Sequence, residues 1–540
     1  MGSLSLQHLP NELVAQILLS CSFNDILSCQ ATCRFLYEIV TTSSIIQYRI
    51  SLDISGLEDN PRCKLSTPDR LELLQRREAA WALFRPNFIQ QVPVNNTAVV
   101  IYELSGGTYL LSGVSRDSIN HLRLPSRQQS EVPRWDHIPV TDELLDFGLA
   151  VTEHDLIGVL TISSDDIIST LQIRFLQLST GLPHPLSRAP MRFSQPILPD
   201  NLGVGIEIVG NLAALVIRDV SFGHHNRDKL LILDWKRGIV RAELYVDSRR
   251  YQSAIFLTAE ILLVTNAHEK CLEIWRIPCD SPESTLPIIC QQPELSLALP
   301  VIHPGFMVSE FACRGAPNPV LSNCDTSRPF HSSPYESIMV FHLTISPIEP
   351  RVPIPFVFFA HRRSFLQLLD EAEIRPKPPR STPIPWAEWG PPRTRWLRAR
   401  SIPTEWITTT SGQRYAYVGA RAPGPPQPVT VLDFNQNHVR RVRKNLKNQQ
   451  SPYHGIFSDN VTADEGEDLT RRIWVEESRD THEQMKVFAE DVGGYLPYVG
   501  VKSAKPYDFH GVLMDDERII GIKRNHALTG VESIEVVHMG

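Results

Sequence analysis

The sequence predicts a multidomain protein with a small all-α unit of three helices, a connector helix and a large all-β domain. Apolar residues recur at helical spacing over the first fifty residues. From about Val94 onward, short apolar runs alternate with polar turns, which is typical of β-strands. A polar turn followed by an apolar strand recurs at Asp155, Asn211 and Glu260, at intervals of 56 and 49 residues. Repeats of ~40–50 residues with several strands each are typical of β-propellers. We therefore expect a propeller of about seven blades, with six or eight as the nearest alternatives.

Three short helices are expected in the N-terminal unit. Pro10 suits the first turn of the first helix, where a missing N–H costs nothing, and Asp25 is a good N-cap for the second. The apolar positions of these helices are Leu9, Leu13, Val14, Ile17, Leu18, Cys21, Ile26, Leu27, Ala31, Phe35, Leu36, Ile39 and Val40. Domains near ~40 residues rarely bury so much apolar surface alone. Either the rest of the chain covers this surface, or another protein does.

The order of landmarks in this unit carries a resemblance. The chain reads L-P-x-E-L-x-x-x-I-L from Leu9, then D-I-L-x-C from Asp25, then C-R followed by five residues and Val40. This order resembles the F-box, and the likeness extends over residues 6–40. The resemblance implies docking on a Skp1-like adaptor and, through it, on the cullin of a ubiquitin ligase. The Skp1-binding side chains that it implies are Leu9, Pro10, Leu13, Ile17, Leu18, Leu27 and Phe35. Cys29 and Cys33 would then be small buried residues.

Composition excludes several classes of protein. Hydrophobic residues make up 42% of the chain and charged residues 21%, which fits a globular protein. The net charge of −7 does not favour nucleic-acid binding. Nine cysteines without a C-x-x-C spacing favour a reducing compartment. The sequence has no apolar run of eighteen residues, the length that would suggest a membrane span. We expect a cytoplasmic or nuclear location, with no membrane, nucleic acid or cofactor bound.

A connector is expected between the F-box, residues 1–50, and the β domain, residues 94–540. Within residues 51–93, Pro68–Phe84 contains strong helix formers, and Pro86 follows its end. Leu71, Leu74, Glu78 and Trp81 fall close to one face of that helix. Trp81 is therefore expected to anchor the connector on the β domain.

Two short segments relate the β domain to a known blade type. Leu233–Asp234–Trp235 and Glu273–Ile274–Trp275 are similar to the penultimate strand of WD-type blades, although the usual Gly-His and Trp-Asp landmarks are missing. The last run, Ser533–Gly540, is expected to pair with an early strand such as Val99–Leu104, because closing the ring removes exposed sheet edges. Two irregular β-sandwiches are the alternative architecture.

Long loops are expected near residues 313–336, 372–400 and 435–468. The middle stretch concentrates Trp386, Trp389, Arg393, Arg395 and Trp396. Trp and Arg are enriched at binding hot spots, so these side chains are candidates for a rim that grips a substrate; alternatively, the indoles fasten the loop to the propeller. The run W-x-x-W-G-P also resembles a large group of fungal F-box proteins.

Catalytic signatures were sought in the sequence and not found. The chain has no H-E-x-x-H, G-x-S-x-G or P-loop motif and no Cys/His quartet for zinc. We therefore expect a non-catalytic, substrate-recognition adaptor of an SCF-type ubiquitin ligase, with a protein substrate on the β domain. A Skp1-bound scaffold that acts without cullin is the alternative, and a propeller hydrolase is a third possibility.

Overall fold

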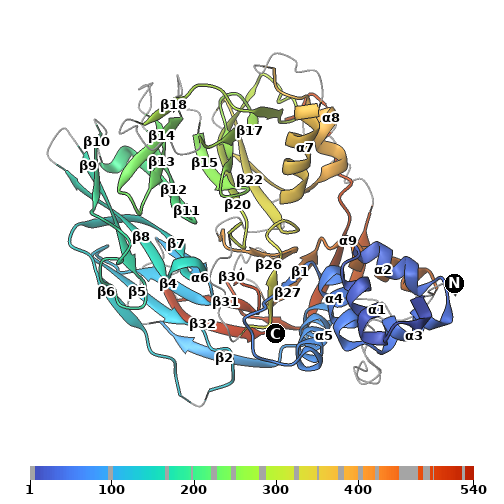
Figure 1. Ribbon diagram of the computed structural model, residues 1–540. Helices are drawn as coiled ribbons and strands as arrows, with labels where there is room; N and C mark the ends of the chain where they lie inside the picture. The colour runs from blue at the N-terminus through green and yellow to red at the C-terminus, as the bar shows by residue number, and fades with distance from the viewer. Residues whose placement is uncertain are drawn as a thin grey trace.

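The computed structural model describes residues 6–94, 101–129, 131–164, 169–195, 199–220, 228–244, 251–278, 287–320, 328–349, 352–374, 382–398, 406–419, 425–448, 472–477, 487–490, 492–525 and 530–540. Within these residues, a helical module at the N-terminus stands beside a ring of β-sheets (Figure 1). The ring consists of seven sheets of four or five strands, which confirms the predicted β-propeller of seven blades.

Blades 1 to 3 follow one another along the chain, and the third has an added fifth strand. Blade 1 comprises β3 (Tyr102–Ser105), β4 (Thr108–Ser112), β5 (Ser118–Arg123) and β6 (Asp136–Pro139). Blade 2 comprises β7 (Glu143–Ala150), β8 (Leu156–Ser164), β9 (Ser169–Gln177) and β10 (Met191–Gln195), with the short helix α6 (Val151–His154) after β7. Blade 3 comprises β11 (Leu202–Val209), β12 (Leu212–Asp219), β13 (Lys229–Asp234), β14 (Ile239–Leu244) and β18 (Ile288–Cys290), and β18 runs parallel to β14. The turn η2 (Pro199–Asn201) precedes it.

Blades 4 to 6 follow, and the last two carry inserted helices. Blade 4 comprises β15 (Tyr251–Phe256), β16 (Ile261–Asn266), β17 (Cys271–Arg276) and β19 (Leu295–Ala298). Blade 5 comprises β20 (Phe306–Arg314), β22 (Ile338–Pro347), β23 (Ile354–His361) and β24 (Thr394–Arg398), with α7 (Arg362–Ile374) and α8 (Trp386–Arg393) between the last two. Blade 6 comprises β25 (Thr410–Ser411), β26 (Arg414–Val418), β27 (Gln427–Asp433), β29 (Tyr498–Tyr507) and β28 (Ile473–Glu476), and α9 (Gln436–Lys447) follows β27.

Blade 7 closes the ring with strands from both ends of the chain. It comprises β30 (Gly511–Met514), β31 (Arg518–Arg524), β32 (Val531–His538) and β2 (Phe88–Pro93). Strand β2 pairs antiparallel with β32, from Phe88 opposite His538 to Pro93 opposite Ser533, and the two lie side by side in Figure 1. Closure by the last strand is as expected, but its partner is Phe88–Pro93 and not Val99–Leu104. The propeller therefore takes its first strand from the stretch expected to be connector.

Apolar side chains fill the gaps between blades. Within the described residues, seven buried clusters each join two neighbouring blades around the full ring. Alternation along a strand supplies both sides, because successive side chains point to opposite faces of a sheet. In β22, for example, Phe341 and Leu343 pack in the gap to blade 4, whereas Val340 packs in the gap to blade 6. This pattern explains strands that read as continuous apolar runs.

The stretches expected as long loops contain regular structure. Residues 372–400 include the end of α7, all of α8 and β24, and residues 435–468 include α9; residues 449–468 lie outside the described part. In residues 313–336, β21 (Phe330–Ser332) pairs with β1 (Leu57–Asp59) of the connector. The proline and arginine content that suggested loops accompanies short elements that pack on the blades.

Candidate docking surface of the helical module

The helical module consists of the turn η1 (Leu6–His8) and α1 (Asn11–Leu19), α2 (Phe23–Gln30), α3 (Arg34–Thr42) and α4 (Ser44–Ser55). Its core is a cluster of buried side chains from all four α-helices: Val14, Ala15, Leu18, Ile26, Ile39, Val40, Ile46 and Ile50. Leu9 and Phe35 pack against this cluster and are partly buried. The three predicted helices are therefore confirmed, and a fourth completes their core.

Helix α1 buries one apolar face and exposes another. Pro10 is its N-cap residue. Val14 and Leu18 point into the module, whereas the side chains of Leu13 and Ile17 are 45% and 44% exposed. Residues four apart lie on the same helix face, so Leu13 and Ile17 form an apolar stripe that this chain leaves uncovered. The sequence pattern did not distinguish this stripe from the buried one.

Helix α2 adds another exposed apolar side chain. Ser22 caps this helix: its hydroxyl accepts from the N–H of Asp25 at 3.3 Å and donates to the Asp25 carboxylate at 2.6 Å. The prediction of Asp25 as the N-cap is thus wrong. The N-cap is Ser22, and Asp25 lies three residues further on, in the position that pairs with the N-cap in a capping box. Ile26 is fully buried and Leu27 is exposed. The cap fixes which side of α2 faces solvent.

Helix α4 was not expected from the sequence. Its buried residues Ile46, Tyr48, Ile50 and Leu52 alternate as in a strand. A helix buried on several sides loses its amphipathic signal, and α4 lies between the other helices and the connector. It ends at Gly56, whose φ of +66° favours glycine.

Hydrogen bonds fix the module against the propeller. The hydroxyl of Tyr48 donates to the carbonyl of Pro329 at 3.2 Å, and the amide of Asn435, at the start of α9, donates to the carbonyl of Ile54 at 2.8 Å. The amide of Asn60 donates to the carbonyl of Arg328 at 2.7 Å. A cleft of about 850 Å³ separates α4 and β1 from the loops of blades 5 and 6. The module therefore has a defined orientation.

The connector helix α5 (Thr67–Leu83) extends this attachment. Ser66 caps it, and Trp81 is buried with Leu83 in the core between blades 6 and 7. Glu78 forms ion pairs with Arg77 at 2.9 Å and with Arg414, whose guanidinium lies 5.3 Å from the Trp81 ring centre. Trp81 therefore anchors the connector on the propeller, as expected.

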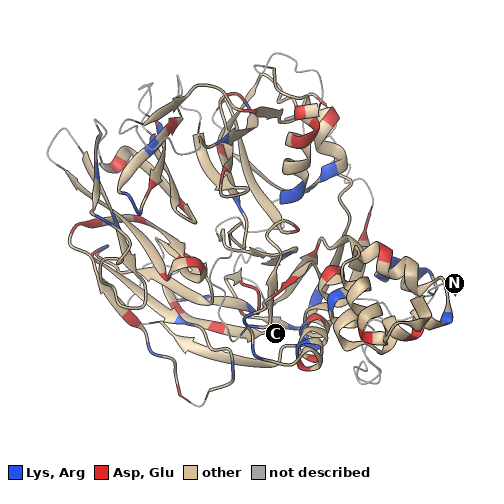
Figure 2. Cartoon of the chain, viewed as in Figure 1, with Lys and Arg blue, Asp and Glu red and all other residues tan. Residues whose placement is uncertain are grey.

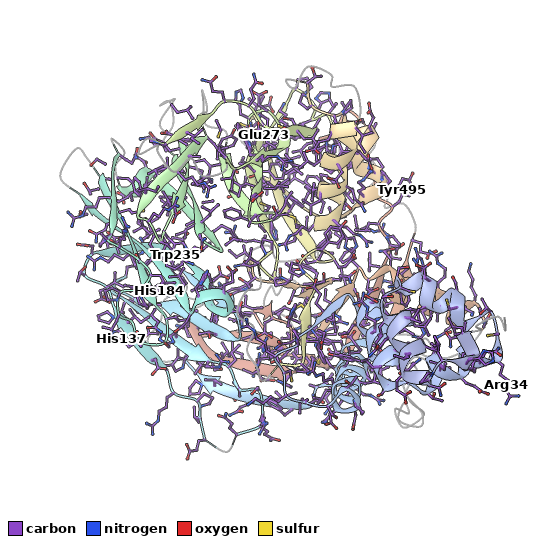
Figure 3. The ribbon with its side chains drawn as sticks, in the orientation of Figure 1. Arg34, His137, His184, Trp235, Glu273 and Tyr495 are labelled. Atoms are coloured by element: carbon purple, nitrogen blue, oxygen red, sulfur yellow. The ribbon has the colours of Figure 1, made fainter. Side chains whose placement is uncertain are left out.

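Charged residues on the module are exposed at its far end. Arg34 pairs with Glu38 at 2.8 Å, and Figure 3 shows Arg34 pointing outward, away from the propeller. In Figure 2 the helices of the module are mostly tan, with acidic and basic residues scattered along them.

The second set of predicted site residues is buried. Trp386, Trp389, Trp396 and Arg395 are enclosed in blade 5 and its neighbours. Trp396 stacks on Phe358 at 4.6 Å, and Arg395 Nε donates to the carbonyl of Leu496 at 3.0 Å. Arg393, partly exposed, pairs with Glu371 of α7 at 3.0 Å. This burial favours the alternative interpretation, in which the indoles fasten the inserted helices to the propeller, and the substrate-gripping rim stays a prediction.

The sequence reasoning missed a group of charged residues at the centre of the ring. Glu103, Asp146 and Glu207 lie on β3, β7 and β11, the first strands of three consecutive blades. These first strands contact one another around the centre. The available signal was an acidic residue inside an apolar run, as in Ile206–Glu207–Ile208.

The fold and the docking surface define a helical module fixed to a seven-bladed propeller. Residues 6–52 match the F-box-like family model. The N-terminal part of the chain, which includes α1 to α3 and most of α4, is thus an F-box-like domain. No curated protein matches the chain.

Solved structures show similarity at low identity. The chain is similar to the WD40 domain of coronin from Toxoplasma gondii, with 10% identity, a TM-score of 0.38 and coverage of 84% of this chain and 87% of that one. It is similar to Kuenenia stuttgartiensis hydrazine synthase, with 10% identity, a TM-score of 0.31 and coverage of 63% and 78%. It is also similar to the Cps50 (Swd1) β-propeller domain of Myceliophteria thermophila, with 10% identity, a TM-score of 0.28 and coverage of 51% and 86%.

Other kinds of site were looked for in the described part of the chain. There, no helix has the length and apolar character to cross a membrane. No group of three or more His, Cys, Asp or Glu side chains among those residues is arranged to hold a metal ion.

Proposed function

We propose that this chain is the substrate-recognition adaptor of an SCF-type ubiquitin ligase. The F-box-like domain would bind a Skp1-like adaptor, and through it cullin, while the propeller would bind a protein substrate. The uncovered stripe of Leu13 and Ile17 on a module that is otherwise well packed carries the proposal. The resemblance to fungal F-box proteins supports the same division of labour, and the role implies a cytoplasmic or nuclear location.

In this proposal the chain makes and breaks no covalent bond. It holds a substrate lysine near the E2 enzyme that carries ubiquitin, which raises the effective concentration of the two reacting groups. The hydrogen bonds and the buried connector that fix the module on the propeller support this role. A rigid connection sets the distance between ligase and substrate, whereas a flexible linker would not.

We assign contacts with the Skp1-like adaptor to Leu9, Pro10, Leu13, Ile17, Leu27 and Phe35. Leu18 is buried in the module and acts by supporting α1. Docking is thus assigned to the region expected at residues 1–50, substrate binding to the propeller, and positioning to the connector between them.

The test is capture of a Skp1-like adaptor by the full chain carrying Leu13→Ala and Ile17→Ala. Because both side chains are exposed, the fold should be retained. Each truncation should weaken binding by about 1–2 kcal/mol, or roughly tenfold. Leu73→Ala is the matched control, because Leu73 is a leucine of similar exposure on the connector helix. Unchanged capture by the double variant would contradict the proposal.

The same complexes discriminate the scaffold alternative. If the wild-type chain co-purifies with a Skp1-like protein and cullin and forms ubiquitin ladders on a bound protein, the ligase role holds. Capture of the Skp1-like protein without cullin would support the scaffold.

A further inference from the structure

A cavity of about 280 Å³ opens at the centre of the propeller, among the first strands of blades 3, 4 and 5. Its walls include apolar side chains, among them Ile206, Val216 and Phe311, and the charged residues Glu207 and Arg314. This volume is just below the ~300–1,000 Å³ range of small-molecule pockets. It admits one long side chain and excludes a folded segment.

The cavity lining contains two carboxylates, Glu207 and Glu310, and two guanidinium groups, Arg218 and Arg314. Glu103, Asp146 and Glu207 all interact electrostatically with Arg314, which reaches the centre from β20. Within the described residues, none of the three forms an ion pair with Arg314, although all three feel its charge. A second arginine, Arg218, is influenced by carboxylates of its own. Three carboxylates thus surround Arg314 at the centre of the ring, and of these Glu207 lines the cavity.

Two of these three carboxylates accept hydrogen bonds, and the third has no hydrogen-bond donor among the described residues. Glu103 accepts from the Thr408 hydroxyl at 3.2 Å, and Asp146 accepts from the N–H of Phe147 at 2.9 Å. Among the described groups, none donates a hydrogen bond to the carboxylate of Glu207, which lines the cavity. Burial raises the pKa of Asp146 and of Glu207 to about 7. A cation in the cavity would favour their charged forms.

An unpartnered histidine provides a second, independent sign of a ligand. His342, on β22, lines the same cavity and is 9% exposed. Neither ring nitrogen has a hydrogen-bond partner in the described part of the chain. Buried polar groups nearly always have a partner, so the cavity contains both a carboxylate and an imidazole that a polar ligand would satisfy.

We propose that the central cavity receives one basic side chain, lysine or arginine, from the protein that the propeller binds. Its cationic end meets the carboxylate of Glu207, and its aliphatic stem packs along Ile206, Val216 and Phe311, as long basic side chains commonly do on apolar walls. This inference rests on the proposed role of the propeller in substrate recognition and names one feature of the substrate.

The test is isothermal titration calorimetry of the full chain with three capped peptides at low salt. Each has two glycines on either side of a central residue, which is arginine, lysine or citrulline. Citrulline keeps the shape of arginine without its charge, and charge-assisted hydrogen bonds are about twice as strong as neutral ones. We expect the arginine or lysine peptide to bind at least about tenfold more tightly than the citrulline peptide. Equal binding of all three, or no binding of the two basic peptides, would overturn the proposal.

Variants show where the peptide binds. Glu207→Gln should weaken binding of the basic peptide by about tenfold, while Glu243→Gln, on the outer part of the same blade, should leave it unchanged. Removal of a buried charge should keep the chain folded, which circular dichroism checks; if Glu207→Gln fails to fold, Glu207→Asp, which withdraws the carboxylate by one methylene, replaces it. Unchanged affinity in the variant would overturn the proposal. The experiment does not involve the adaptor, so its outcome is separate from that of the Leu13→Ala and Ile17→Ala test.

Discussion

Replacing Trp389 by alanine tests whether the inserted helices of blade 5 are structural. The indole is 1% exposed and lies edge-to-face with Trp386 at 5.1 Å between ring centres. Its Nε1 donates to the carbonyl of Ala298, on β19 of blade 4, at 2.8 Å. Truncating a buried Trp costs about 3–5 kcal/mol. We therefore expect Trp389→Ala to lower the free energy of unfolding by about 4 kcal/mol, a large fraction of the ~5–15 kcal/mol of a typical domain.

The measurement is urea denaturation followed by circular dichroism, with capture of bound proteins from a cell extract in parallel. Trp389→Phe keeps most of the ring and loses the hydrogen bond, so it should be destabilised by only about 1–2 kcal/mol. Tyr335→Ala, at an exposed aromatic residue, should change stability by less than about 0.5 kcal/mol. If Trp389→Ala unfolds at the wild-type urea concentration but loses its bound proteins, the structural interpretation is refuted.

Two further predictions concern ring closure and acid stability. Val92 is fully buried opposite Ile534, so Val92→Ala should lower the free energy of unfolding by about 1.5–3 kcal/mol. Ile89→Ala, on the exposed side of the same strand, should lower it much less. Equal shifts in melting temperature for the two variants would contradict closure by β2. Burial acts to raise the pKa of Asp433, but Arg414 and His438 outweigh it and lower the pKa to about 2. The folded pKa is thus below the unfolded value, so this group stabilises the fold above about pH 4 and the contribution, roughly 2 kcal/mol, is lost as pH falls toward 2. The free energy of unfolding, measured with urea from pH 6 to pH 2, should depend less steeply on pH in Asp433→Asn than in the wild-type chain. An unchanged pH dependence would contradict this assignment.

The blades could be predicted from the sequence because the information that defines them is local. A strand and the polar turn before it lie within a dozen residues, as at Asp155–Leu156 before β8 and Asn211–Leu212 before β12. The F-box-like helices were predicted for the same reason. Helix α4 was missed because its sides face different partners, so its sequence has no single apolar face.

The strand that closes the ring could not be chosen from the sequence. Several apolar runs near residue 90 or 100 have suitable residues to pair with β32, and their sequence separation from it exceeds four hundred residues. The choice depends on the connector: the packing of Trp81 and Phe84 against blades 6 and 7 delivers the chain directly to Phe88 beside His538. Where two runs have equal strand propensity, their positions in the tertiary structure decide which of them pairs.

The composition of residues 386–396 left two interpretations open for a different reason. Trp and Arg are enriched at binding hot spots because they combine large area with hydrogen bonding, and the same properties suit a core where inserted helices meet a sheet. Composition therefore does not distinguish the two settings. An acidic residue inside an apolar strand is more informative, because burial of its charge costs free energy unless something compensates it. Glu207 has that position: Arg314 and Arg362 offset part of the cost of burying its charge, and the proposed ligand cation would offset more of it.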